Sequence, residues 1–198
     1  MYKRQHLSKL TNALENSDLI NLPLFSIEDS ERIPAEFKNI KDLSKQFSTF
    51  DPYEPVMKDV AAYIFTSGTT GLPKAALVDH AKLVKGSFAG HFLCFNFKTK
   101  DRLYMTLPLY HSTGLVLGWA ASLRAGCANI IKPKFSASEF WSDVKKYKAN
   151  KFIYVGELCR YLMNLPASET DKSNSIVQIS GNGLRPDIWD SFQKRFNI

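Results

Sequence analysis

Short apolar runs alternate with helix-length segments along most of this chain, and this order constrains the fold more than any other feature. An alternation of this kind is typical of α/β proteins, in which parallel strands are joined by helical crossovers. We therefore expect part of a doubly wound, mostly parallel sheet. The runs that we interpret as its strands are residues 60–65, 103–107, 128–131, 152–155 and 176–179.

The predicted helices carry boundary signals. Asp79 can cap a helix that runs toward Cys94. Ser136 and Glu139 have the spacing of a capping box ahead of another helix. Pro186 suits the first turn of a last helix, because a proline there lacks only an N–H group that the helix would not use.

Residues 103–123 contain no Asp, Glu, Lys or Arg. A stretch of this length could span a bilayer. Pro108, His111 and Ser112 fall near the middle of this stretch, however. Polar groups and a proline are most costly there in lipid. We expect a buried strand, a polar loop and a buried helix instead of a membrane span.

Composition narrows the function classes. The net charge is +7, but its most basic cluster, which contains Lys145, Lys146, Lys148 and Lys151, is typical of the solvated end of a helix, so we expect no nucleic-acid partner. The three cysteines have no paired or zinc-binding spacing and are interpreted as free thiols. No metal site is predicted from these residues.

A turn near Asp51 suggests that the chain has two parts: a poorly defined segment and linker over 1–58, and a domain over 59–198.

One loop has the chemistry of an anion site. Glycines let backbone N–H groups approach an oxygen atom, hydroxyls add neutral donors, and a lysine neutralises phosphate. A Ser/Thr/Gly surface turn would explain the polarity but not the lysine. The spacing Gly68-x-x-Gly71-x-x-Lys74 is not that of a Walker loop, and a short strand over 75–78 separates it from the next helix. The candidate phosphate ligands are Thr66, Ser67, Gly68, Thr69, Thr70, Gly71 and Lys74.

Two further loops follow predicted strands, over 108–114 and 180–185. Because parallel strands end along one edge of a sheet, we expect all three loops to meet there. The second loop contains His111, which by itself would be interpreted as a hydrogen-bonded core histidine. The third, from Gly181 to Pro186, does not fit the dinucleotide pattern, since the proline occupies its third glycine position.

The residues 63–74, reading YIFTSGTTGLPK, resemble the signature of the AMP-forming, acyl-adenylating synthetases. Residues 107–114, LPLYHSTG, resemble the second motif of that superfamily. FSASEFW at 135–141, YVGELCRYL at 154–162 and GNGLR at 181–185 resemble its very-long-chain acyl-CoA synthetase and fatty acid transport protein branch. The resemblance covers about 59–198, and it implies part of the large adenylation domain.

The resemblance implies a ligase with two half-reactions. A fatty carboxylate attacks the α-phosphorus of ATP in the presence of Mg²⁺ and releases pyrophosphate, and coenzyme A then displaces AMP to give a thioester. It implies phosphate binding for the residues of 66–74 named above. The superfamily usually has glycine after the lysine, and Ala75 at this position is typical of the branch. It implies that His111 orients the acyl and adenylate groups, and that Gly181, Asn182 and Gly183 lie near the base and acyl pocket.

The same resemblance implies parts that these 198 residues do not contain. They are the magnesium-binding Gly-x-Thr-Glu segment, a ribose-binding aspartate, the small carboxyl-terminal domain and any upstream membrane anchor. We therefore expect a fragment that forms little acyl-adenylate alone, from a parent on the cytosolic side of endoplasmic reticulum, peroxisomal or plasma membranes. The alternative is a degenerate adenylate- or partner-binding module.

Overall fold

The computed structural model describes residues 12, 24–26, 37–46, 51–66 and 73–198. It divides into two compact units, Met1–Glu54 and Pro55–Ile198. In the first unit, strand β1 (Leu24–Ser26) pairs in parallel with β2 (Phe37–Asn39), and helix α2 (Ile40–Ser44) follows directly. The Asn39 side chain caps α2, since its Oδ1 accepts from the Lys41 N–H at 2.9 Å.

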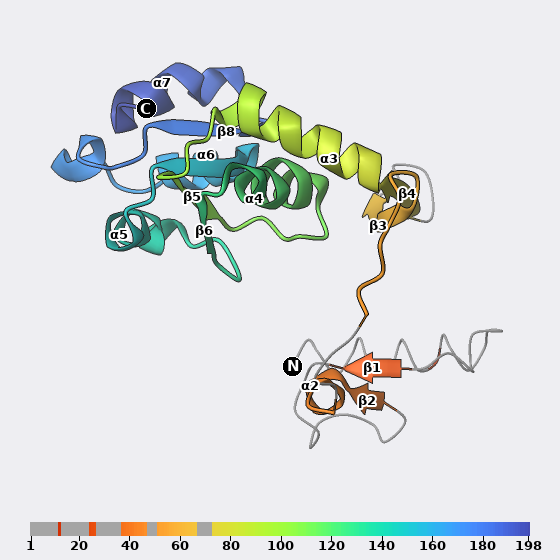
Figure 1. Ribbon diagram of the computed structural model, residues 1–198. Helices are drawn as coiled ribbons and strands as arrows, with labels where there is room; N and C mark the ends of the chain where they lie inside the picture. Colours follow the sequence, from red (N-terminus) through yellow and green to blue (C-terminus); the bar gives the residue numbers. More distant parts are fainter. Residues whose placement is uncertain (1–11, 13–23, 27–36, 47–50, 67–72) are drawn as a thin grey trace. The chain divides into compact units, whose positions relative to one another are not determined.

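The second unit is built on a parallel four-stranded sheet in the order β6–β5–β7–β8 (Figure 1). Its strands are β5 (Arg102–Met105), β6 (Ala128–Ile131), β7 (Lys151–Val155) and β8 (Gln178–Asn182). The predicted α/β class and parallel sheet are confirmed. The chain moves from β5 to one neighbour, β6, and then returns past β5 to β7. The strand order therefore reverses between β5 and β7, which is where open α/β sheets usually bind ligands.

The helices form two groups. The first contains α3 (His80–Ala89), the π-helical segments η2 (Gly90–Phe95) and η3 (Thr113–Ala120), and α4 (Ala121–Ala125). The second contains α5 (Ala137–Tyr147), α6 (Gly156–Met163) and α7 (Pro186–Phe196). Members of each group pack on one another. The crossover through η3 and α4 runs from β5 to β6, whereas those through α5 and α6 run in the opposite direction across the sheet, and right-handed crossovers of opposite direction lie on opposite faces.

One predicted strand lies outside the parallel sheet. Strand β3 (Val60–Thr66) forms a two-stranded antiparallel hairpin with β4 (Lys74–Asp79), and Thr66 pairs with Lys74 at its turn. The expectation that all three candidate loops follow strands of one sheet is therefore wrong for the first loop. The physical reason is length, because a parallel crossover needs about a dozen residues and only 67–73 join these strands.

A second correction concerns the last strand. It begins at Gln178 and not at residue 176, so Gly181 and Asn182 belong to the strand and not to the loop after it. The backbone before it is held by other partners. The Ile176 N–H donates to Asn174 Oδ1 at 3.0 Å, and the Val177 N–H donates to the Asn150 carbonyl at 2.9 Å.

All three predicted helix starts are confirmed, since α5 begins directly after Ser136. Asp79 caps α3, accepting from the Lys82 N–H at 2.7 Å, and Pro186 occupies the first turn of α7. The capping box at Ser136 is wrong, since its Oγ lies 3.2 Å from Ser138 Oγ and caps no helix N–H. A capping box occurs instead at Ser168, ahead of the short 3₁₀ helix η4 (Glu169–Lys172).

Residues 103–123 form a buried strand, a loop and a helix, as expected. In the described part of the chain, every helix is too short or too polar to cross a bilayer. The three cysteines are free thiols, which confirms that prediction.

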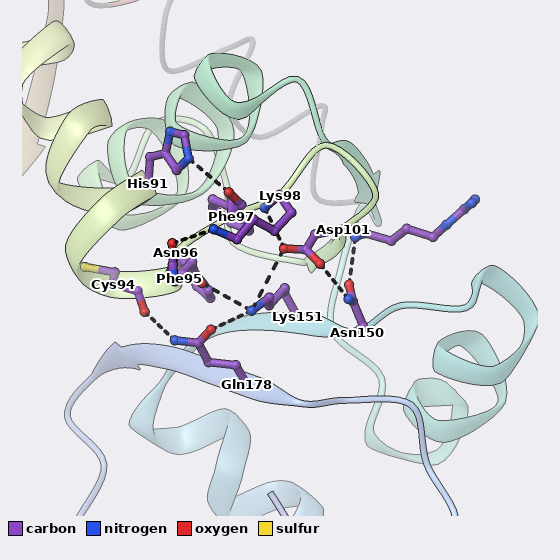
Figure 2. Close-up of polar contacts among 11 residues, drawn as sticks. His91, Cys94, Phe95, Asn96, Phe97, Lys98, Asp101, Asn150, Lys151 and Gln178 are labelled. Carbon is purple, nitrogen blue, oxygen red and sulfur yellow. Dashed lines mark hydrogen bonds and ion pairs between the residues drawn. The ribbon is translucent and has the colours of Figure 1, made fainter.

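The lysine cluster is only partly as expected. Lys145, Lys146 and Lys148 are exposed at the end of α5. Lys151 is not solvated, because it lies in β7 with only 8% of its surface exposed. Its polar contacts are shown in Figure 2.

Candidate active site

The end of the β3–β4 hairpin carries the first candidate site. Thr66 is the last residue of β3 and Lys74 the first of β4, so the pairing brings their backbones together at the base of the turn. The Lys74 side chain is exposed. Ser67, Gly68, Thr69, Thr70 and Gly71 lie outside the described residues. The described geometry therefore fixes the two ends of the proposed phosphate loop.

His111 lies in the loop that follows β5. Its own N–H donates to the Pro108 carbonyl at 3.0 Å, and its carbonyl accepts from the Leu115 N–H at 2.9 Å. The Thr113 N–H donates to Nδ1 of the ring at 3.2 Å. Because Nδ1 is an acceptor, the neutral ring carries its proton on Nε2. The exposed ring can therefore donate a hydrogen bond from Nε2 to a substrate oxygen.

Thr113 connects this loop to the end of β8. Asn182 Nδ2 donates to Thr113 Oγ1 at 3.2 Å, and Thr113 is only 3% exposed. His111 and Asn182 are thus held by the same threonine, through its backbone N–H and its hydroxyl. Thr113 belongs to the motif at 107–114 but is not one of the predicted site residues. Its only sequence signal is its place two residues after the histidine.

Glycines let the strand ends approach closely at this edge. A Cβ atom on Gly156, directly after β7, would overlap the carbonyl of Gly183. Gly183 has φ +72°, a left-handed conformation that glycine adopts without a steric cost. A Cβ atom on Gly114 would lie 2.6 Å from the Pro108 carbonyl oxygen, so the His111 loop is also tightly closed. The hydrogen bond from Asn182 to Thr113 places the predicted residues Gly181, Asn182 and Gly183 beside the His111 loop.

A buried charge network lies behind the same edge, and the sequence analysis missed it. Lys132 follows β6, and its ammonium lies 2.8 Å from Asp143 Oδ2 of α5. The same oxygen accepts from the Tyr104 hydroxyl of β5 at 2.8 Å. Burial raises the pKa of Tyr104 well above its usual range, with a further contribution from this hydrogen bond. The network joins two strands and a helix, and its members are too far apart in the sequence to form a pattern.

The donors at this edge suit an anion better than a cation. At the edge they are the Asn182 amide and the His111 Nε2–H, and the separate hairpin adds the Lys74 ammonium. Metal ions such as Mg²⁺ need oxygen ligands. Among the described residues, no three His, Cys, Asp or Glu side chains gather as a metal site would require. Mg²⁺ often binds through substrate phosphates and water, so these donors fit a nucleotide that brings its own metal ion.

The sequence comparisons identify relatives over most of the chain. The model of the AMP-binding enzyme family matches residues 4–198, which extends the match well before residue 59. A medium/long-chain fatty acid–CoA ligase, FadD6 of Mycobacterium tuberculosis, is 36% identical over 191 residues, which are 93% of this chain and 32% of the relative. Human long-chain fatty acid transport protein 6 is 40% identical over 185 residues, 89% of this chain and 29% of the relative. The chain thus spans about a third of the length of these relatives.

Solved structures show the same fold. ATP-bound MatB from Rhodopseudomonas palustris aligns with a TM-score of 0.71 at 23% identity, over 82% of this chain and 34% of that one. A luciferase-like enzyme from the mealworm Zophobas morio aligns with a TM-score of 0.76 at 17% identity, over 96% of this chain and 44% of that one. At these identities the likeness establishes the fold.

Proposed function

This chain belongs to the AMP-binding enzyme family, and from that premise we propose that it forms part of the nucleotide and acyl site of a fatty acid–CoA ligase. The substrates would be a long- or very-long-chain fatty acid, ATP with Mg²⁺, and coenzyme A. The observation that carries the proposal is the shared Thr113, which joins the His111 loop after β5 to Asn182 at the end of β8.

The hairpin residues would bind the polyphosphate of ATP. Adenylation places a fatty carboxylate beside several phosphate charges, and negative charge then moves onto the departing pyrophosphate. Lys74, with its exposed ammonium, is suited to neutralise that charge. Thr66 and residues 67–71 would add hydroxyl and backbone N–H donors, as the family resemblance implies.

His111 would act on the acyl group. Its Nδ1 is occupied by the Thr113 N–H, so Nε2–H remains to hold a carboxylate oxygen in position for attack on the α-phosphorus. Orientation of this kind accelerates a reaction because the two reacting groups no longer have to find each other by diffusion. In the second half-reaction the same ring would stay beside the acyl carbonyl while the thiol of coenzyme A displaces AMP.

The relatives named as fatty acid transport proteins support a fatty acid as the substrate, and they support a role in fatty acid uptake. We propose that the working protein acts at the cytosolic side of endoplasmic reticulum, peroxisomal or plasma membranes. Acyl-CoA formation there would trap a fatty acid that has crossed the membrane, because the thioester carries the charged coenzyme.

Two ligands can separate the roles of Lys74 and His111 in the 198-residue chain. One is ATP, and the other is a palmitoyl-sulfamoyl adenosine, an acyl-adenylate mimic without β- and γ-phosphates. We expect Lys74→Ala to weaken ATP binding about tenfold, the loss of one charge-assisted contact, and to leave binding of the mimic unchanged. His111→Ala should weaken the mimic more than ATP. Calorimetric titration measures both affinities.

The matched control is Lys100→Ala, which removes an exposed lysine of a turn remote from the hairpin. Equal ATP affinities for the Lys74 and Lys100 variants would remove Lys74 from the proposed site. If the chain bound neither ligand, the ligase proposal would fail for these residues. If it bound partner protein but no nucleotide, the degenerate-module alternative would replace it.

A further inference from the structure

Lys151 is a buried cation at the edge of the sheet where the strands begin, opposite the edge that carries the candidate active site. It begins β7, and Nζ donates to Gln178 Oε1 at 2.6 Å and to the Phe95 carbonyl at 3.2 Å (Figure 2). Asp101 Oδ2 lies 4.0 Å from the same ammonium. A buried charge persists only where partners replace its lost water, and these contacts are the partners of the Lys151 ammonium.

Lys151 and Gln178 both bind carbonyl groups at the end of a helix. Phe95 is the last residue of η2, and the next residue, Asn96, leaves the helix with φ 45°. The final carbonyls of a helix have no partner within it and carry partial negative charge. Here Lys151 binds the Phe95 carbonyl, and Gln178 Nε2 donates to the Cys94 carbonyl at 2.9 Å. Asn96 caps η2 locally through its backbone N–H to the His91 carbonyl, and strands β7 and β8 supply partners for the Cys94 and Phe95 carbonyls.

The counter-charge is itself fixed in place. Asp101 accepts from the Lys98 N–H and from Asn150 Nδ2, each at 2.8 Å, and the Arg102 N–H donates to Asn150 Oδ1 at 2.8 Å. Both carboxylate oxygens therefore have donors, and the network closes around Lys151. The end of η2 is anchored to the start of β5, β7 and β8 together.

The other end of the same continuous helix is bonded to the turn before β3 and to β4. The His80 N–H donates to the Asp59 carbonyl at 3.0 Å, and the Ala81 N–H donates to the Met57 carbonyl at 2.9 Å. Lys82 Nζ donates to the Leu77 carbonyl of β4 at 3.1 Å. The helix formed by α3 and η2 therefore joins the strands that carry Thr66 and Lys74 to the parallel sheet.

We infer that Lys151 is a positioning residue for the β3–β4 hairpin, acting through the α3–η2 helix. Its ammonium holds the carboxyl end of that helix against the sheet, and the helix in turn holds the hairpin that bears Lys74. Only the predicted effect of Lys151 on ATP binding rests on the proposed function. The effect of Lys151 on local opening of the hairpin is measurable by hydrogen exchange without any ligand.

The test compares Lys151→Met with Lys148→Met, which removes an exposed lysine three positions earlier. Hydrogen exchange followed by mass spectrometry reports local opening in the full 198-residue chain. We expect protection in 74–95 to fall about tenfold in the Lys151 variant, with less change in β5 and β6, and no change in the control. Lys151→Arg, which keeps the cation, should restore part of the protection.

A second variant keeps the test decisive if Lys151→Met does not fold. Gln178→Glu retains an oxygen acceptor for Lys151 but loses the amide that donates to Cys94, so protection should again fall in 74–95. Val144→Ala, which leaves a cavity at a buried position of α5, provides the contrast of a general loss of stability. Equal loss of protection in the sheet and the hairpin, as in the Val144 variant, would overturn the inference.

ATP binding gives the functional readout. If Lys151 positions the hairpin, the folded Lys151→Met chain should bind ATP about tenfold more weakly, while the equally folded Val144→Ala chain should bind it as the wild type does. Unchanged ATP affinity in a Lys151 variant whose hairpin has lost protection would overturn the link to the site. If the wild-type chain bound no ATP, the proposed function would fail, and hydrogen exchange alone would decide the inference.

Discussion

Asp143 shows how a single buried residue can join several elements. Only 7% of it is exposed, and one of its oxygens accepts from both Lys132 and Tyr104. Burial by itself raises the pKa of this carboxyl, but the hydrogen bonds from Lys132 and Tyr104 outweigh burial and hold the pKa below its ordinary value of 3.8. The charged form is therefore the one that the fold stabilises.

This direction of shift predicts a specific pH dependence. A carboxyl with a lowered pKa in the folded state contributes stability above its unfolded pKa, and loses it as the pH falls through the folded value. We expect Asp143→Asn to lower the free energy of unfolding by about 1–3 kcal/mol at pH 7, the range for a hydrogen bond to a charged group. The difference from the wild type should shrink below about pH 4.

Urea unfolding at several pH values measures this difference. The matched control is Asp187→Asn, which removes an exposed carboxylate that pairs with Arg185 and should change stability little. A difference between wild type and the Asp143 variant that stays constant from pH 7 to pH 3 would show that its charge does not contribute.

At the scale of elements, helix caps decide where this chain changes structure. The Asp79 side chain accepts from the N–H of Lys82, and this backbone hydrogen bond is the main cause of the lowered pKa of Asp79. Ser136 has the same kind of position ahead of α5 but caps no N–H. The sequence suggests a cap at both residues, but only Asp79 forms the capping hydrogen bond.

The pair makes a direct prediction. Asp79→Ala should lower the midpoint of thermal unfolding by a few degrees, as loss of a helix cap usually does, whereas Ser136→Ala should leave it unchanged. Circular dichroism at 222 nm during heating measures both midpoints. Equal midpoints for the two variants would contradict the assignment of Asp79 as the working cap.

At the scale of the molecule, the chain is two units of unequal size. The second, from Pro55, contains the hairpin, the parallel sheet and both helical groups, with a core of buried residues from β5, β7, α5, α6 and α7. Residues 51–56 before and at the boundary are all exposed. A unit with its own core is expected to fold alone.

We therefore expect residues 55–198, expressed alone, to unfold in one cooperative transition. Their near-ultraviolet circular dichroism should match that of the longer chain in the aromatic core around Tyr104, Phe140 and Phe152. A chymotryptic cut after the exposed Tyr53 should yield a product of nearly the same length. A broad, non-cooperative transition of the shorter chain would show that the first unit is required for folding.

The sequence alone determined the α/β class, five of the strands to within two residues, the starts of helices α3, α5 and α7, and the position of the His111 loop after β5. These depend on local physics, because apolar runs, caps and turns are encoded by neighbours along the chain. The same motifs carried the family resemblance, which the family match bears out. The roles of Thr66, Lys74 and residues 67–71 stay predictions.

Only the tertiary structure decided how distant residues pair. It removed β3 from the parallel sheet, joined His111 to Asn182 through Thr113, and buried Lys151 at the end of a helix that lies some 56 residues away in the sequence. Lys151 shares its local pattern with the exposed lysines before it. Its burial follows from the position of β7 between β5 and β8, which is a property of the whole sheet and not of any segment.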